Sequence, residues 1–230
     1  MASLVWLRNG EGVWTPSGAC ENLSEDREFW RIYHQSFPAE EKEPDEVILA
    51  TAADPLGLVL VFRRIPFPGS GAQTVGLCTL QYLPGIDAAF LVYLAVNPEI
   101  RGKGLGSGVL AVAMDDRAFE ISGLLSPKHR LLEVENPDLA STEQDRRIRE
   151  KRLAFFARAN LSPLYSGYVQ PPLQADTPPL SMLLLSQKES PPDVALAVAA
   201  IYREKYQRVN GLDAKGLDLL YRRSFDGKMP

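Results

Sequence analysis

A strand-like run that ends in a glycine-rich basic turn constrains this chain more than any other feature. Residues 90–96 are apolar, β-branched and aromatic, which is typical of a buried strand, and a helical pattern begins near Leu105. Between the two lies the turn Arg101-Gly102-Lys103-Gly104. Glycines let backbone N–H groups converge on one point, and a helix N-terminus adds unsatisfied donors and the positive end of its dipole. The pattern predicts an anion site that fits a pyrophosphate.

Two widespread phosphate motifs do not explain this turn. A Walker A loop needs GxxxxGK[ST], and a dinucleotide fold needs GxGxxG at the start of a βαβ unit. The run Gly102-Lys103-Gly104-Leu105-Gly106 satisfies neither pattern.

Composition excludes several classes of protein. With 230 residues and 45% hydrophobic content, the chain is expected to form one domain, or one domain with an appendage. The net charge of −4 and the absence of a dense Lys/Arg block argue against a nucleic-acid partner. No apolar run reaches the roughly 18 residues needed to cross a membrane, and Met1–Leu7 is not a signal peptide, so we expect a cytoplasmic protein.

The metal-ligating residue types are too few and too scattered for a metal site. Cys20 and Cys78 form neither a disulfide framework nor a CxxC motif, and His34 and His129 supply no cluster of ligands. The sequence therefore predicts that no metal is bound.

The hydrophobic pattern predicts an α/β protein with a mixed central sheet of about six or seven strands flanked by helices. The expected strands are residues 3–7, 56–64, 73–83, 88–97, 131–135, 164–169 and 180–186. The expected helices are residues 25–35 with Ser24 as N-cap, 45–52, 105–121, 143–160, 193–209 and 213–223.

Arg101, Gly104 and Gly106 fill the pattern Gln/Arg-x-x-Gly-x-Gly/Ala, and the turn resembles the acyl-CoA-binding motif of the GNAT superfamily of N-acetyltransferases. The order of elements over residues 1–188 also resembles the fold of that superfamily. The resemblance implies an acetyltransferase domain over residues 1–188. Residues 189–230 lie outside it as a C-terminal helical extension, which we expect to pack on the domain, with a dimer contact as the alternative.

The resemblance also implies a set of cofactor contacts. Main-chain groups of Leu94, Ala95 and Val96 would bind the acetyl group and the pantetheine arm of acetyl-CoA. The pyrophosphate would be held by Arg101, Gly102, Lys103, Gly104, Leu105 and Gly106. Asn136 resembles an asparagine that binds the pantetheine region, although a turn asparagine before Pro137 is an equal alternative.

One departure from the family pattern affects the chemistry. Phe156 stands where many members have a tyrosine that protonates the leaving thiolate, and Asn160-Leu161 replaces a Gly-Phe pair. Phe156 has no proton to give but could form an apolar wall against CoA. Tyr165 is the candidate replacement acid, with Tyr168, Tyr93 or departure of the thiolate without a protein acid as alternatives.

Attack by a neutral amine on a thioester needs a base. Glu133 and Glu135 lie two apart on one expected strand and so share a face, with Glu135 the preferred base. The alternative is that both are merely solvated. Glu40 and Glu41, in a loop that resembles the acceptor-covering segment of the family, are competing candidates that could instead bind a cationic acceptor. His34 is expected to pack or cap rather than act as base.

These features predict an acetyl-CoA-dependent N-acetyltransferase that acts on a primary amine of an unidentified acceptor by direct attack on the thioester. Its partners would be acetyl-CoA and that amine, and the protein would be a monomer or homodimer. Position 156 is Phe where many members of the family have a tyrosine, and this difference motivates an alternative. The alternative is a non-catalytic acyl-CoA-binding regulatory or scaffold protein with the same fold. An interaction role for the C-terminal helices is compatible with either.

Overall fold

The computed structural model describes residues 5–6, 13–16, 23–64, 71–102, 104–187, 191–225 and 228–230. The chain divides into two compact units. The first contains Met1–Gln81 and Leu91–Ser126, and the second contains Tyr82–Phe90 and Pro127–Pro230. The hairpin of two long strands, residues 73–96, therefore contributes to both units.

The first unit is built on an antiparallel meander. Its strands are β1 (Val5–Trp6), β2 (Val13–Pro16), β3 (Gly57–Arg64), β4 (Gln73–Leu83) and the C-terminal part of β5 (Ala88–Val96). The pairs β1–β2, β2–β3 and β3–β4 are antiparallel, with Val61 opposite Leu77. The predicted meander is confirmed for β3 and β4. Strand β2 was not expected from the sequence, and the remainder of the strand expected at residues 3–7 lies outside the described residues.

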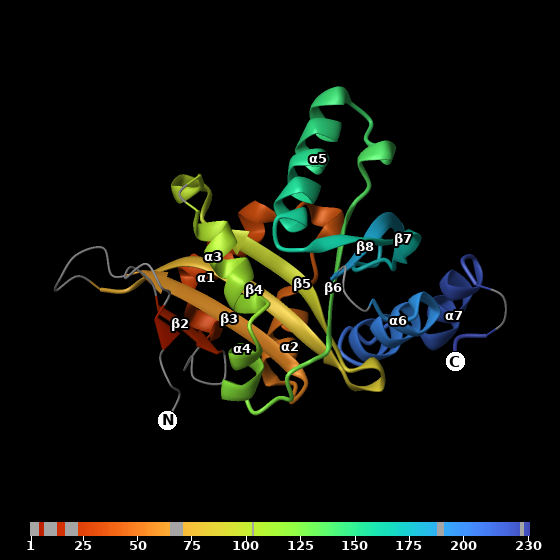
Figure 1. Cartoon of the computed structure of the whole chain (residues 1–230), viewed down its shortest axis with the longest axis horizontal. Coiled ribbons are helices and arrows are strands. Elements are labelled where there is room, and N and C mark those ends of the chain that lie inside the picture. The colour runs from red at the N-terminus through yellow and green to blue at the C-terminus, as the bar shows by residue number, and fades with distance from the viewer. Residues whose placement is uncertain are drawn as a thin grey trace. The chain divides into compact units, whose positions relative to one another are not determined.

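Helices lie on both faces of these strands (Figure 1). They are α1 (Arg27–Ser36), α2 (Asp45–Ala53), α3 (Leu105–Ala113) and α4 (Asp116–Ile121). A core cluster joins Phe29 and Ile32 of α1 and Ile48 of α2 to Val59 of β3 and Ala95 of β5. Burial along β3 and β4 is nearly continuous, because helices cover both faces of these strands.

Two helix boundaries differ from the sequence prediction. Helix α1 is capped by Asp26, whose carboxylate accepts from the Phe29 N–H at 3.0 Å, and not by Ser24, which lies in the 3-10 turn Leu23–Glu25. The helix expected over 105–121 is broken between α3 and α4, where Asp115 accepts from the Arg117 N–H. In both places an aspartate offers the backbone an N-cap that starts a new helix.

The second unit has a three-stranded antiparallel ladder. Strand β6 (His129–Glu135) pairs with β8 (Leu180–Gln187), and β8 pairs with β7 (Leu161–Gln170). Helix α5 (Glu143–Ala157) lies between β6 and β7 in the sequence. All three strands and α5 are found close to their predicted positions.

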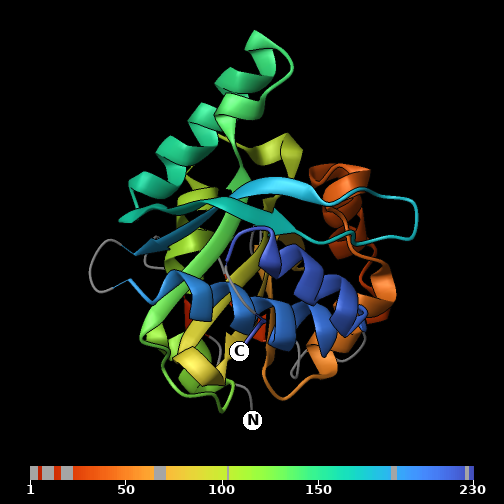
Figure 2. The same cartoon turned by 90° about the vertical axis from the view of Figure 1, so that its right-hand side faces the viewer.

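The C-terminal residues of this unit form helices α6 (Val194–Ala200) and α7 (Ala214–Arg222), which are drawn in blue in Figure 2. Instead of a continuous α-helix over 193–209, α6 passes into a π-helix, η7 (Ile201–Gln207). Tyr202 of η7 donates to the Val169 carbonyl of β7 at 2.6 Å. The assignment of residues 189–230 as a separate extension stays a prediction.

The predicted fold class, a mixed sheet flanked by helices, is confirmed, with six strands from β3 to β8 preceded by the short β1 and β2. Across the described ranges, no helix is long and apolar enough to span a membrane.

Candidate functional site: a glycine loop at the start of helix α3

The turn singled out in the sequence connects β5 to α3 in the first unit. After Val96 the chain forms a 3-10 turn, Pro98–Ile100, and then passes through Gly102 and Gly104, which have φ angles of 84° and 78°. Side chains other than glycine rarely adopt these angles, so both glycines are required by the backbone path. Lys103 lies outside the described residues. The predicted strand, glycine turn and helix are present in that order.

The start of α3 is open to an anion. Gly104 is the N-cap residue and has no side chain to cap the helix, and the first intrahelical bond runs from the Gly108 N–H to the Gly104 carbonyl at 3.1 Å. The N–H groups of Leu105, Gly106 and Ser107 therefore lack an acceptor within the helix. A Cβ placed on Gly102 or Gly104 would meet no atom within 4 Å, so the space beside the loop is unfilled. The N–H donors, the positive end of the α3 dipole and the unfilled space beside the loop together suit a phosphate group.

Arg101 adds positive charge at the same point. Its side chain is exposed, Nε donates to the Val96 carbonyl at 3.2 Å, and Nη2 donates to the Ser36 hydroxyl at 3.4 Å. The guanidinium thus bridges the end of β5 and the end of α1 beside the glycine loop.

The three residues expected to contact the acetyl group end strand β5. Ala95 and Val96 are buried and Leu94 is half-buried. Beside them, Gly76 of β4 allows a close approach that sequence reasoning missed. A Cβ at Gly76 would lie 2.9 Å from the Ala95 carbonyl oxygen and 3.4 Å from Cγ2 of Val109 on α3. A lone glycine within an apolar strand was the available signal.

Tyr93, one of the possible acids, is committed to structural bonds. Its hydroxyl donates to the Glu41 carbonyl at 2.8 Å and accepts from the Glu43 N–H at 2.9 Å. Burial, with the nearby Glu43 charge and Tyr33, raises the pKa of Tyr93 well above its ordinary value. A phenol that holds its proton so firmly is a poor acid for a thiolate.

Glu135, in the second unit, lies in an ionic network with helix α5. Its Oε1 is 3.2 Å from Nη2 of Arg149, and its Oε2 accepts a hydrogen bond from Arg152. Arg149 also pairs with Asp145 at 2.8 Å. Both carboxylate oxygens of Glu135 are therefore engaged by guanidinium groups.

Asn136 follows Glu135 and caps the 3-10 turn Pro137–Leu139. Its side-chain oxygen accepts from the Asp138 N–H at 3.0 Å, and its carbonyl accepts from Arg149 at 3.0 Å. This geometry is that of the turn asparagine that the Asn-Pro sequence favours.

Glu133 meets residues that sequence reasoning did not connect with it. Its Oε1 accepts from the Tyr206 hydroxyl of η7 at 2.8 Å and from the side-chain amide of Gln170 on β7. The link between Glu133 and Tyr206 spans 73 positions in the chain, and no local pattern could have indicated it.

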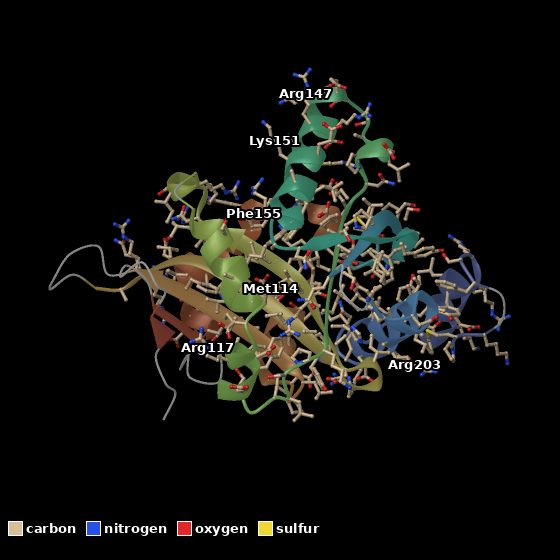
Figure 3. All side chains as sticks on the ribbon, in the orientation of Figure 1. Met114, Arg117, Arg147, Lys151, Phe155 and Arg203 are labelled. Carbon is tan, nitrogen blue, oxygen red and sulfur yellow. The ribbon has the colours of Figure 1, made fainter. Side chains whose placement is uncertain are left out.

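Phe156 and Asn160 mark the departure from the family pattern. Phe156 is buried at the end of α5, whereas Phe155 projects from α5 on the same side as Arg147 and Lys151 (Figure 3). Asn160 has a φ of 63°, so it occupies the left-handed position that a glycine commonly fills after a helix. Asparagine tolerates that conformation, which explains how it can stand in place of the glycine.

The two downstream tyrosines differ in accessibility. Tyr165 is half-buried, and its ring lies 5.4 Å from that of Phe225. Its Cζ and hydroxyl oxygen occupy the space beside Gly167 where a side chain would otherwise lie. Tyr168 is buried, and burial together with the nearby Glu133 charge raises its pKa well above the ordinary value. Tyr165 is thus the more accessible of the two.

The remaining candidates are peripheral to these contacts. Glu40 is exposed, and the side chain of His34 lies 3.3 Å from Asp45. Among the described residues no group of three or more His, Cys, Asp or Glu is arranged to hold a metal ion, and Cys78 is buried as a free thiol.

The sequence matches no protein-family model and no curated protein. Among solved structures, the chain is similar to a protein described as a GNAT-family acetyltransferase from Bacteroides thetaiotaomicron, with 20% identity, a TM-score of 0.57, and coverage of 80% of this chain and 91% of that chain. It also aligns with an N-acetyltransferase structure from Lactobacillus plantarum (10% identity, TM-score 0.47, coverage 76% and 98%). A GNAT-family acetyltransferase from Elizabethkingia anophelis with acetyl-CoA bound aligns with 11% identity, a TM-score of 0.41, and coverage of 63% and 82%.

The first of these similarities defines the class of fold. The chain has the acyl-CoA N-acyltransferase fold of the GNAT acetyltransferases, and the resemblance predicted from Arg101, Gly104 and Gly106 is confirmed at the level of the fold.

Proposed function

We propose that the protein is an acetyl-CoA-dependent N-acetyltransferase that transfers an acetyl group to a primary amine by direct attack on the thioester. The observation that carries this proposal is the glycine loop at the start of α3, with Gly102 and Gly104 at positive φ and an uncapped helix N-terminus. A helix N-terminus of this kind suits the pyrophosphate of CoA. The acetyltransferase fold supports the same reading.

Most of the proposed cofactor residues lie in the first unit. The loop residues 101–106 would bind the pyrophosphate, and the backbone of Leu94, Ala95 and Val96 would bind the acetyl group and the pantetheine arm. In the second unit, Asn136 remains a proposed contact for the pantetheine arm, and Phe156 a proposed apolar wall against CoA. Asn136 would have to offer its amide nitrogen, because its side-chain oxygen already accepts a backbone bond.

The proton transfers are assigned to residues of the second unit. Glu133 or Glu135 would accept the proton of the amine, and Tyr165 would protonate the leaving thiolate. The raised pKa values of Tyr93 and Tyr168 support Tyr165 over these alternatives. The variants Glu133→Gln and Glu135→Gln distinguish the two glutamates. The base is identified by the variant that lowers kcat and keeps the affinity for acetyl-CoA.

The decisive experiment is calorimetric titration with acetyl-CoA, free CoA and ATP. We expect micromolar binding of acetyl-CoA and CoA but not of ATP. Gly104→Val should weaken acetyl-CoA binding at least tenfold, equivalent to about 1.4 kcal/mol, because its side chain would enter the unfilled space beside the loop.

Gly108→Ala is the matched control, since Gly108 lies within α3 and a Cβ there also meets no atom within 4 Å. Its affinity should equal that of the unchanged protein. Equal affinity in Gly104→Val would remove the main support for the proposal.

The alternative is a non-catalytic acyl-CoA-binding protein, which the buried Phe156 at the tyrosine position favours. An amine panel of spermidine, kanamycin and a lysine peptide distinguishes the two, because sustained CoA release with any of them excludes a non-catalytic role. We further propose a cytoplasmic location and the amine acceptor as second partner.

A further inference from the structure

Two tyrosine hydroxyls hold the connection between α1 and α2, residues 37–44. The hydroxyl of Tyr93 on β5 binds this segment twice, at the Glu41 carbonyl (2.8 Å) and at the Glu43 N–H (2.9 Å). The hydroxyl of Tyr33 on α1 donates to the Glu43 carbonyl at 2.8 Å. The backbone of Glu43 is therefore bound on both sides.

The same contacts are shielded from water. Tyr33, Tyr93 and Glu43 are 0%, 4% and 1% exposed. The ring of Tyr93 lies 4.6 Å from that of Phe37, which begins the segment, and 5.2 Å from that of Tyr33. Hydrogen bonds in such an environment are strong, and an unpaired partner there is costly, so the segment is held in one position.

The segment lies beside the proposed acetyl end of the site. Tyr93 directly precedes Leu94, and it shares a buried cluster with Ala95, against which Phe37 packs. At the start of the segment, Arg101 of the cofactor loop bonds Ser36. Thus the strand and the loop proposed to hold acetyl-CoA both contact this connection or the helix end that leads into it.

We infer that Tyr93 is a positioning residue, whose hydroxyl fixes residues 37–44 as a wall of the acceptor-amine site next to the acetyl group. This inference rests on the proposed acetyltransferase function. Because the hydrogen bonds of the Tyr93 hydroxyl go to this segment, loss of the hydroxyl affects the acceptor and leaves the binding of acetyl-CoA intact.

The test compares three conservative variants of the full chain. Tyr93→Phe removes both bonds to the segment and Tyr33→Phe removes one. Tyr82→Phe is the control, because the hydroxyl of Tyr82 donates to Asp87 in the second unit. For each variant we measure hydrogen exchange of the Glu43 amide, the Kd for acetyl-CoA, and kcat and KM with the best amine of the panel named above.

In Tyr93→Phe we expect exchange at Glu43 and the acceptor KM each to rise about tenfold, with the Kd for acetyl-CoA unchanged. Tyr33→Phe should raise the exchange rate at Glu43 and the acceptor KM by a smaller factor, and Tyr82→Phe should raise neither quantity. If Tyr93→Phe leaves exchange at the Glu43 amide unchanged, or speeds it without changing the acceptor kinetics, the inference is wrong. The proposed acetyltransferase function is not affected by that result. If the unaltered protein turns over no amine, the proposed function fails and this inference fails with it.

Discussion

At the scale of single residues, Asp26 joins three elements of the first unit. Its carboxylate accepts from the Phe29 N–H, from Arg63 on β3 and from Thr74 on β4, each at 3.0 Å. Burial alone would raise its pKa, but these hydrogen bonds and the Arg63 charge more than offset burial, and the pKa is lowered from 3.8. The folded state therefore favours the ionised form.

This lowered pKa predicts a loss of stability in acid. The contribution of Asp26 is complete above its unfolded pKa of 3.8 and is lost as the pH falls through the folded value. Denaturant unfolding at several pH values should show Asp26→Ala less stable by about 1–2 kcal/mol at pH 7, with a smaller difference below pH 3.8. A difference that stays constant down to pH 2.5 would contradict the assignment.

Among the described glycines, Gly57 has the least room for a side chain. A Cβ there would lie 2.0 Å from the Thr51 carbonyl oxygen of α2. We predict that Gly57→Ala lowers the free energy of unfolding by about 1–3 kcal/mol, because α2 has to move away from β3. Gly85→Ala, which meets no atom within 4 Å, is the control and should change stability by less than about 0.5 kcal/mol in the same urea titration.

The glycines of the turn could be located from local backbone chemistry. Gly102 and Gly104 could be recognised because a turn into a helix N-terminus needs positive φ. By contrast, the Tyr206 to Glu133 bond and the Tyr93 to Glu41 bond join residues 73 and 52 positions apart. Such contacts depend on how the elements pack, and neighbouring residues in the sequence carry no sign of them.

At the scale of elements, helix ends were the least predictable feature. Ser24 and Asp26 are both good N-cap residues, and the contacts of Asp26 with Arg63 and Thr74 decide between them. The π-helix at Ile201–Gln207 could not be expected, because its buried Tyr202 and Tyr206 also fit the spacing of an α-helix. Long apolar runs such as β4 were located correctly, since burial on both faces leaves little choice of structure.

The end of α5 gives a testable case. Asn160 adopts a φ of 63°, where Gly is unstrained and Ala is not. Asn160→Gly should leave the melting temperature unchanged or slightly raised, whereas Asn160→Ala should lower it by about 2–4 °C, the equivalent of roughly 1 kcal/mol. Calorimetric scans of both variants provide the check, and equal melting temperatures for Gly and Ala would show that this position carries no strain.

At the scale of the whole molecule, the fold class was predictable and the division into two units was not. The order of strands and helices, together with Arg101, Gly104 and Gly106, led to the acetyltransferase fold that the structure has. The boundary between the units cuts the continuous strands β4, after Gln81, and β5, after Phe90. No change in composition marks that point, because a strand shared by two units reads as one apolar run.

The C-terminal helices leave few large apolar side chains exposed. Apolar side chains that could have formed a dimer contact, such as Val198, Ile201 and Leu217, are buried. Among the described residues of 191–230, the large apolar side chains still exposed are Leu196 and Leu219. Two leucines cover far less than the roughly 800 Å² per partner of a stable interface.

We therefore predict that the protein is a monomer at micromolar concentration. Light scattering coupled to size exclusion should give the mass of one chain, and Leu196→Glu combined with Leu219→Glu should leave that mass and the unfolding midpoint unchanged, because neither side chain fills a core. A dimer that the double variant dissociates would show instead that α6 and α7 carry the interface. A dimer that survives it would place the contact elsewhere on the chain.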